Sequence, residues 1–298
     1  IAFMGKTYTV EEATFDSFKG IDIALFAGGS ISKDFAPHAV KAGAVVIDNS
    51  SAFRMDPEVP LVVPEVNPQA ILKHKGIIAN PNCSTIIMVM ALKPIYDLAK
   101  IKRVIVSTYQ AVSGAGKEGI DELDAQVRDH SEGREMTANI LPSASAEKHY
   151  PIAFNLIPQI DVFCDNLYTK EEMKMVNETK KIMEDYEMRI TATTIRVPVY
   201  RSHSESVNIE LEKEVDLGAM REALAKFPGV TVQDDPSKQE YPMPLYTSEK
   251  DDVYVGRLRR DESCEKSYNI WVVGDQIRKG AALNTLQIAE TMIKNGWI

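Results

Sequence analysis

One short motif in the sequence combines a reactive residue with the local structure that such a residue needs. The motif is Pro81-Asn82-Cys83-Ser84-Thr85, which follows a short apolar run at 76–80 and precedes a longer apolar segment at 84–98. This order predicts a strand, a turn and a helix, with Cys83 at the helix N-terminus. Free N–H groups and the helix dipole stabilise the nucleophilic thiolate there. The pattern indicates covalent catalysis, although an ordinary small buried cysteine fits equally well.

Asn82 stands directly before this cysteine, and two roles are open to its side chain. An asparagine just before a helix caps the free N–H groups of the first turn. The same amide could instead donate a hydrogen bond to an oxyanion formed beside the cysteine.

His203 is the histidine that best fits a proton-transfer role beside a nucleophilic cysteine. It alone lies at the start of a predicted strand, whereas the other four fall in predicted exposed helices or polar loops: His38, His74, His130 and His149. Arg196 precedes it by seven residues, so the two side chains would face opposite sides of one regular strand. A bend at Pro198 or at 201–203 would bring both to one site. A structural histidine is an equal alternative.

Two weaker signals follow other strand ends. Gln110 and the turn Ser113-Gly114-Ala115-Gly116 come after a predicted strand at 103–109, and glycines there let the backbone approach a ligand closely. Arg54 follows another strand end in Asn-Ser-Ser-Ala-Phe-Arg. Taken alone, a plain turn and a surface arginine explain these residues as well.

The elements that must position these residues alternate in type along the first part of the chain. Short apolar runs predict strands, and longer periodic segments between them predict helices; the strands are 1–4, 21–27, 44–49, 60–63 and 76–80, and the helices are 33–42 and 84–98. Such alternation is typical of a doubly wound α/β domain. Pro94 is expected to kink or end the second helix.

The second part of the chain has a different pattern. Strands at 189–200 and 203–213 are long and alternate strongly; the other predicted elements are a helix at 116–130, a polar loop at 131–148, helices at 170–186, 219–227 and 280–295, and a strand at 269–274. Long alternating strands predict a mixed or antiparallel sheet, so we expect an α+β arrangement. One face of this sheet is available to a partner subunit.

Composition excludes several classes of protein. The 298 residues with 44% hydrophobic content suffice for one large or two ordinary domains. A net charge of −9 without a basic run argues against a nucleic-acid partner. Cys83, Cys164 and Cys264 are widely spaced, which predicts neither a disulfide framework nor a metal site and fits the reducing cytoplasm. No apolar stretch reaches the roughly 20 residues of a membrane span, and no signal peptide is predicted.

With these residues placed, the sequence resembles the aspartate-semialdehyde dehydrogenases, in the form found in many Gram-positive bacteria. Five motifs carry the likeness, which runs from the start to Ile298: 49–54, 81–85, 110–116, 203–206 (His-Ser-Glu-Ser) and 278–284 (Arg-Lys-Gly-Ala-Ala-Leu-Asn). The resemblance implies a Rossmann-like NADP-binding domain over 1–83 and 278–298. It implies a catalytic and dimerisation domain over 84–277, and a homodimer or homotetramer.

The resemblance also implies roles for individual residues. Cys83 is the expected nucleophile, His203 the general acid/base, and Gln110 orients the substrate. Arg196 and Glu171 are expected to hold the substrate carboxylate and amino group, and Arg54 and Lys174 to bind phosphate. Glu171 and Lys174 lie three apart on a predicted helix and so share a face, although outside the resemblance they would be an ordinary solvated pair. The expected cofactor contacts are Gly28, Gly29, Ser30, Ser113, Gly114, Gly116 and Asn284.

The implied reaction is the NADPH-dependent reductive dephosphorylation of L-aspartyl 4-phosphate to L-aspartate 4-semialdehyde through a Cys83 thioester. This step serves the synthesis of lysine, diaminopimelate, threonine and methionine. An enzyme like N-acetyl-γ-glutamyl-phosphate reductase and a cofactor-less dimerisation module are the alternatives. The family's opening strand and turn, Gly-x-Thr-Gly-x-Val/Ile-Gly, do not occur here. The sequence is therefore expected to begin after that segment and to bind NADPH weakly.

Overall fold

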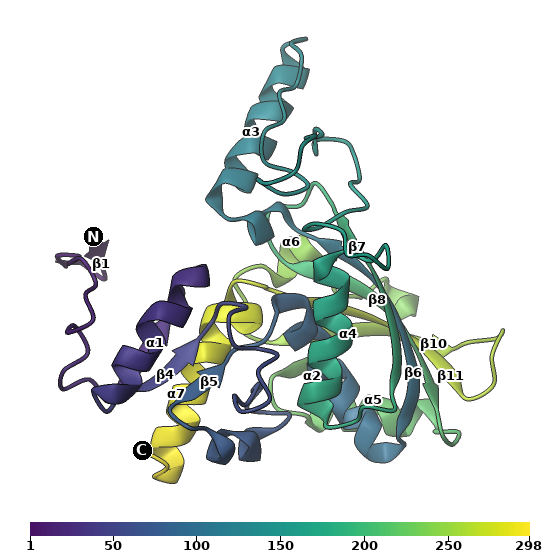
Figure 1. The fold of residues 1–298 in the computed structure, drawn as a ribbon. Helices are drawn as coiled ribbons and strands as arrows, with labels where there is room; N and C mark the ends of the chain where they lie inside the picture. Colours follow the sequence, from purple (N-terminus) through teal and green to yellow (C-terminus); the bar gives the residue numbers. More distant parts are fainter.

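A small parallel sheet forms the first part of the computed structural model, which describes residues 1–298 (Figure 1). Its strands are β3 (Ile23–Phe26), β4 (Val45–Asp48) and β5 (Ile77–Ala79), in that order. Val46 packs on one face with α1 (Ser32–Lys41), and Ile47 packs on the other with α7 (Leu283–Asn295). Helices cover both faces, so the predicted doubly wound arrangement is confirmed.

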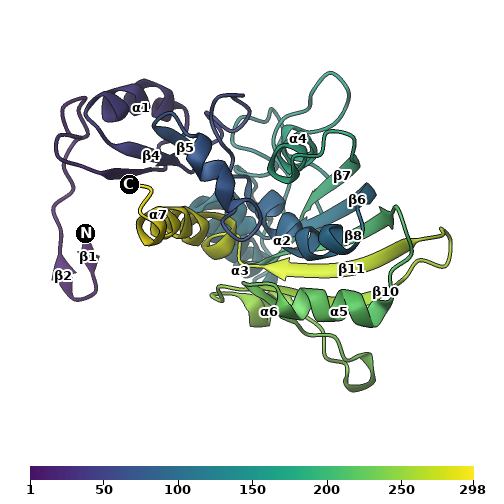
Figure 2. The same cartoon turned by 90° about the horizontal axis from the view of Figure 1, so that it is seen from below.

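A six-stranded mixed sheet forms the second part. Its order is β7 (Arg189–Arg196), β6 (Ile101–Gln110), β8 (His203–Leu211), β11 (Ser267–Gly274), β10 (Val253–Arg260) and β9 (Val230–Val232). The β6–β7 and β9–β10 pairs are parallel and the others antiparallel, which confirms the predicted mixed sheet. Figure 2 shows the small sheet on the left and this large sheet on the right, with α7 and α2 between them.

Three helices cover one face of the large sheet: α2 (Cys83–Leu98), α4 (Lys170–Met183) and α5 (Leu217–Lys226). They bury a core of 34 residues against it. Helix α2 is apolar around most of its circumference because sheet and helix surround it, and it does not end at Pro94 but continues to Leu98. None of the helices is both long and apolar enough to cross a membrane.

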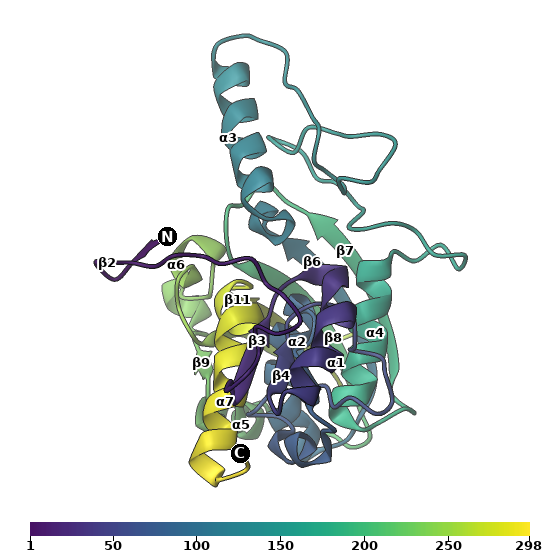
Figure 3. The same ribbon diagram turned by 60° about the vertical axis from the view of Figure 1, so that its left-hand side comes forward.

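An arm projects from the body of the molecule, made of α3 (Lys117–Ser131) and the irregular segment 132–169 (Figure 3). A small apolar cluster of its own, which includes Leu123, Leu141 and Ile152, stabilises the arm.

The remaining elements of the chain are short. They are β1 (Ala2–Phe3), β2 (Lys6–Thr7), η1 (Gly29–Ile31), η2 (Pro68–Lys73), η3 (Val112–Ala115), η4 (Pro236–Lys238), α6 (Pro244–Thr247) and the π-helical turn η5 (Arg278–Ala282).

Some predicted elements differ from the observed ones. The predicted strand 1–4 is a short exposed hairpin, β1–β2, outside both sheets. Residues 60–63 form only a single bridge, Leu61 to Ala79, and the Asn67 side chain bonds the Leu61 carbonyl and the Val63 N–H. Strand β10 was not predicted, since arginines and Gly256 interrupt its apolar pattern; at Gly256 a Cβ would lie 2.4 Å from the Gln233 carbonyl oxygen.

Candidate active site

The ends of three adjacent strands bring the predicted polar residues together. Gln110 at the end of β6 pairs with Arg196 at the end of β7. On the other side of β6, Tyr109 pairs with Ser204, which places His203 beside Gln110. Residues 197–202 cross over the end of β6, and Ser202 has φ of 71° in this turn. The predicted bend is confirmed: Arg196 and His203 belong to two strands that flank a third.

His203 lies against the predicted nucleophile. Its Nε2 is 3.6 Å from the Sγ of Cys83, and its Nδ1 accepts the backbone N–H of Ala111 at 3.0 Å. The neutral ring therefore carries its proton on Nε2, facing the sulfur. Burial and the nearby Arg196 guanidinium lower the pKa of His203 well below its ordinary value. At neutral pH this histidine is an uncharged hydrogen-bond donor toward Cys83.

The Cys83 thiol opens toward a cleft but is surrounded by protein on most sides. Burial and the Glu171 carboxylate raise the pKa of Cys83 to about 12, and they outweigh Arg54, Arg196 and the Ser84 N–H, which lower it. The stabilisation of the thiolate expected at the helix N-terminus is therefore outweighed in the free protein by burial and by the Glu171 carboxylate. Activation of the thiol requires a change in the charges around it.

Arg196 is a buried cation without an anionic partner. Its side chain is 3% exposed; Nη1 donates to the Ala111 carbonyl at 2.7 Å, Nε has no partner, and it forms no ion pair. Gly114 packs directly against it, since a Cβ there would lie 2.6 Å from Nη1. A buried charge of this kind is costly unless it is paired. Because Arg196 lines the cleft, it offers a site for a negatively charged group.

Glu171 lies on the other side of the thiol and binds three side chains. Its Oε1 accepts from Asn82 Nδ2 at 2.9 Å and Gln110 Nε2 at 3.3 Å, and its Oε2 accepts from Lys174 Nζ at 3.2 Å. Burial acts to raise the pKa of Glu171, but Lys174 and the amide donor of Asn82 hold it below the ordinary value. The carboxylate is thus charged. The shared helix face predicted for Glu171 and Lys174 is confirmed.

Asn82 combines a structural contact with a contact in the site. Its Oδ1 accepts the Thr85 N–H at 3.1 Å, which confirms the predicted cap of α2. Its Nδ2 donates to Glu171, so the amide is directed at a carboxylate rather than left free for an oxyanion.

Arg54 reaches the cleft from the loop after β4. Its Nε donates to the Asn80 carbonyl at 2.9 Å, its Nη2 to the Asn49 carbonyl at 3.0 Å, and its Nη1 is 3.4 Å from Oε1 of Glu178. The cleft has a volume of about 430 Å³. Its lining includes Gly29, Asn49, Ser50, Ser51, Arg54, Pro81, Asn82, Cys83, Gln110, Ser113, Gly114, Ile160, Glu171, Lys174, Arg196, Gln276, Ile277, Gly280 and Ala281.

The expected cofactor residues divide into two groups. Gly29, Ser113 and Gly114 line the cleft, whereas Gly28, Ser30, Gly116 and Asn284 do not. Asn284 is fully buried: its Nδ2 donates to the Val62 carbonyl and Asn80 Oδ1, and its Oδ1 accepts from Lys279. Both polar atoms of the Asn284 side chain are thus occupied within the protein, and its expected contact with the cofactor stays a prediction.

Sequence reasoning missed several residues around the nucleophile. Gly280 packs against Cys83, where a Cβ would lie 3.1 Å from that of the cysteine. Gln276 bridges the Ser113 hydroxyl and the Ser202 N–H, and so fixes the turn before His203. Glu178 binds Arg54 and the Asn82 backbone. Its position four residues after Lys174, on the same predicted helix face, was the signal that could have found it.

Comparisons with known proteins cover nearly the whole chain. A family model described as the NAD binding domain of semialdehyde dehydrogenase matches residues 2–74, and one described as the dimerisation domain matches 92–279. Aspartate-semialdehyde dehydrogenase of Aquifex aeolicus is 57% identical over 100% of this chain and 87% of its own length. That of Bacillus subtilis is 53% identical over 99% of this chain and 86% of its own.

A solved structure agrees with the sequence matches. Aspartate-semialdehyde dehydrogenase II of Vibrio cholerae superimposes with a TM-score of 0.90 and 46% identity, covering 99% of this chain and 86% of the other. The architecture, the cleft and the sequence identity lead to one conclusion: the chain belongs to the aspartate-semialdehyde dehydrogenase family.

Proposed function

We propose that the chain reduces L-aspartyl 4-phosphate to L-aspartate 4-semialdehyde through a thioester on Cys83. The observation that carries the proposal is the pair of opposite charges beside the sulfur. The unpaired guanidinium of Arg196 matches the α-carboxylate of an amino acid, and the carboxylate of Glu171 matches its α-ammonium group. The solved complex of the Vibrio cholerae relative with ASA supports a substrate site in this fold.

The first step transfers the acyl group to the enzyme. The Cys83 sulfur attacks the acyl carbon, the C–O bond to phosphate breaks, and the thiol proton leaves with the phosphate. Arg54 and Lys174 line the same cleft and supply positive charge to the departing group. Since Glu171 raises the pKa of Cys83, an ammonium group bound to Glu171 would offset that effect. Substrate binding therefore favours the thiolate that the free protein disfavours.

The second step reduces the thioester. NADPH, when bound, supplies the hydride. His203 directs Nε2–H toward the sulfur and donates to the carbonyl oxygen as negative charge develops there. Rupture of the C–S bond then releases the aldehyde and leaves the Cys83 thiolate, which takes up a proton from water by way of His203 to restore the thiol. Gln110 and Asn82 hold Glu171 and so orient the substrate.

The residues beside the sulfur fit a dinucleotide. Gly29 has φ of 65°, and a Cβ built there would meet no atom within 4 Å, so the backbone at the end of β3 borders open space. Ligands of parallel α/β sheets bind at the carboxyl ends of the strands, which is where Gly29 and Asn49 lie. Gly29, Ser113 and Gly114 would hold the cofactor. The preference for NADP over NAD is a further part of the proposal.

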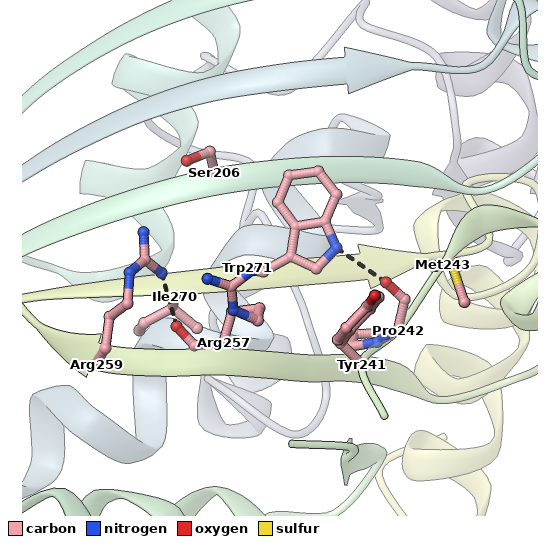
Figure 4. Close-up of a pocket in the computed structure, with 8 residues that line it drawn as sticks. All are labelled: Ser206, Tyr241, Pro242, Met243, Arg257, Arg259, Ile270 and Trp271. Atoms are coloured by element: carbon pink, nitrogen blue, oxygen red, sulfur yellow. Dashed lines mark hydrogen bonds between the residues drawn. The ribbon is translucent and has the colours of Figure 1, made fainter. Parts of the chain in front are cut away.

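We also propose that two copies of the chain associate through the uncovered face of the large sheet. Figure 4 shows part of this face, where Trp271 and two arginines line a pocket closed on one side by Tyr241 and Pro242. Trp271 and Tyr109 lie side by side with ring centroids 5.6 Å apart. This face combines Tyr109 and Trp271 with small polar residues such as Ser206 and Asn208, and aromatic residues are enriched at subunit interfaces. The NADP-binding domain would comprise 1–83 and 278–298, and the catalytic domain 84–277, in a cytoplasmic enzyme.

The direct test is the reverse reaction. Phosphate-dependent reduction of NADP⁺ with aspartate semialdehyde should proceed, and omission of phosphate should leave an aspartyl adduct on Cys83 that mass spectrometry detects. An adduct elsewhere would refute the thioester assignment. Turnover with N-acetylglutamate semialdehyde in place of aspartate semialdehyde would favour the sister enzyme. The N-acetyl substrate has no ammonium group for Glu171, which is the reason to prefer aspartyl phosphate.

A further inference from the structure

Helix α4 presents a row of four charged residues at spacings of three, four and three: Glu171, Lys174, Glu178 and Lys181. Residues at these spacings share one helix face. The first two meet the proposed substrate site. Glu178 and Lys181 do not take part in the proposed mechanism. Glu178 nevertheless accepts a hydrogen bond from the backbone before Cys83, and Lys181 donates one to the loop of Arg54.

Glu178 holds the backbone directly before the nucleophile. Its side chain is 1% exposed, and its Oε2 accepts the Asn82 N–H at 2.6 Å. That N–H lies outside the hydrogen bonds of α2 and would otherwise be a buried donor without a partner. The other oxygen, Oε1, lies 3.4 Å from Nη1 of Arg54. One carboxylate therefore links the turn of Cys83 to the guanidinium expected to bind phosphate.

Lys181 fixes the loop that carries Arg54. Its Nζ donates to the backbone carbonyls of Arg54, Asp56 and Val59, at 2.8, 2.6 and 2.8 Å. An ammonium group has three donors, and all three are used on one loop. The cysteine turn and the arginine loop come from different parts of the chain, and α4 binds both.

We propose that Glu178 is a positioning residue that, together with Lys181, sets the distance between the Cys83 sulfur and the anion site at Arg54. The identity of the anion as a phosphoryl group rests on the proposed function. Neither residue needs to touch the substrate. Because Glu178 acts on Arg54 through charge and on Asn82 through a hydrogen bond, different substitutions separate the two effects.

Three variants remove the contacts of Glu178 and Lys181 separately. Glu178→Gln keeps an oxygen for the Asn82 N–H but loses the charge beside Arg54, whereas Glu178→Ala loses both. Lys181→Met keeps the length of the side chain and loses all three donors to the loop. Asn177→Ala, on the exposed side of the same helix, is the matched control.

The experiment measures alkylation of Cys83 by iodoacetamide, located by peptide mass spectrometry, with increasing inorganic phosphate as the protecting ligand. The concentration for half-protection should rise about tenfold in Glu178→Gln and Lys181→Met, because the anion site loses its alignment. Their alkylation rate without phosphate should stay within about twofold of the unsubstituted protein, since the cysteine turn keeps its acceptor. Glu178→Ala should change both quantities, and Asn177→Ala neither.

The alkylation experiment tests the positioning role of Glu178 and Lys181 even if the protein shows no catalytic turnover. Unchanged phosphate protection in both Glu178→Gln and Lys181→Met would overturn the proposal, as would failure of phosphate to protect the unsubstituted protein. If Glu178→Ala does not fold, phosphate protection in Glu178→Gln and Lys181→Met still tests the proposal. An inactive unsubstituted protein would refute the proposed function and leave this test standing. In an active one, Glu178→Gln should raise the KM for phosphate in the reverse reaction more than it lowers kcat.

Discussion

The two sheets bury their side chains in different ways. Strand β4 of the small sheet is covered on both faces, with Val46 against α1 and Ile47 against α7. In the large sheet, alternate residues of β6 such as Val104 and Val106 face the helices, whereas Ile105 and Tyr109 on the other face are half-buried. A strand covered on both sides needs a continuous apolar run, and a strand covered on one side needs alternation.

The difference shows where polar chemistry can be placed. In the small sheet, the strands are apolar except for Asp48, the last residue of β4, and the polar Asn49 follows just beyond it. In the large sheet, the covered face itself turns polar at its edge, where Gln110, Arg196 and His203 are buried side by side. Gln110, Arg196 and His203 are therefore held by strands, Cys83 by the start of α2, and the expected cofactor residues that line the cleft by the short turns η1 and η3.

Cys83→Ser should abolish turnover, with a loss of several orders of magnitude, and leave the melting temperature unchanged. The serine hydroxyl is a far weaker nucleophile at neutral pH, but it fits the same space at the start of α2. Steady-state kinetics and thermal melts measure the two quantities. Cys164→Ser and Cys264→Ser should retain activity, and loss of activity in either would mean that the edge of the covered face is not the only reactive site.

Ile288→Ala should destabilise the small sheet by about 2–5 kcal/mol, because it removes a fully buried side chain of α7 from the face of β4. Urea titration followed by fluorescence measures the change. Ile293, on the same helix, is 62% exposed. Ile293→Ala should therefore have little effect, and equal losses in the two variants would contradict the two-sided packing of β4.

Glu171→Gln should change two rates in opposite directions. Turnover should fall by about 10–100-fold, because the substrate ammonium group loses its charged partner. Alkylation of Cys83 should become faster at pH 8, since the Glu171 carboxylate is the largest charge effect that raises the pKa of the thiol. If alkylation slows together with turnover, Glu171 does not control the thiol through its charge.

Glu205→Gln should alter the pH dependence of stability. Glu205 is fully buried on the helix-covered face, neither carboxylate oxygen has a partner, and burial raises its pKa well above the ordinary value. A raised pKa contributes stability below the unfolded-state value, near 4.3, and this stability is lost as pH rises toward the folded-state value. As the pH rises from 5 to 8, the stability of the Gln variant relative to the unsubstituted protein should therefore increase by on the order of 1 kcal/mol, or about 2–4 °C in Tm. A constant difference across this range would contradict the assignment.

Local patterns in the sequence predicted the strands of the small sheet, four of the six strands of the large sheet (β6, β7, β8 and β11) and the candidate site residues Cys83, Arg196 and His203. The order strand, turn, cysteine, helix is local, and so is the alternation of β7 and β8. The placement of β6 between these two strands is not local, which is why the spacing of Arg196 and His203 looked unfavourable. The burial of Asn284 and the contacts of Glu178 also depend on distant segments.

The pKa of Cys83 could not be predicted from its position at the start of a helix. The helix dipole is a local property that lowers a thiol pKa. Burial and the Glu171 carboxylate come from the tertiary structure, and in the free protein they are larger. A local motif therefore identified the candidate nucleophile without indicating its protonation state.

The packing of α7 on β4 has a consequence for how the protein folds during synthesis. Ile47 emerges from the ribosome long before Ile288 and Met292, the residues that cover it. At about 5–20 residues per second, tens of seconds pass between the two events. During that interval the nascent small sheet exposes the part of its apolar face that α7 covers in the folded protein. Protection by a chaperone at this stage should matter more for the yield of this chain than for a protein whose sheets are completed by neighbouring segments.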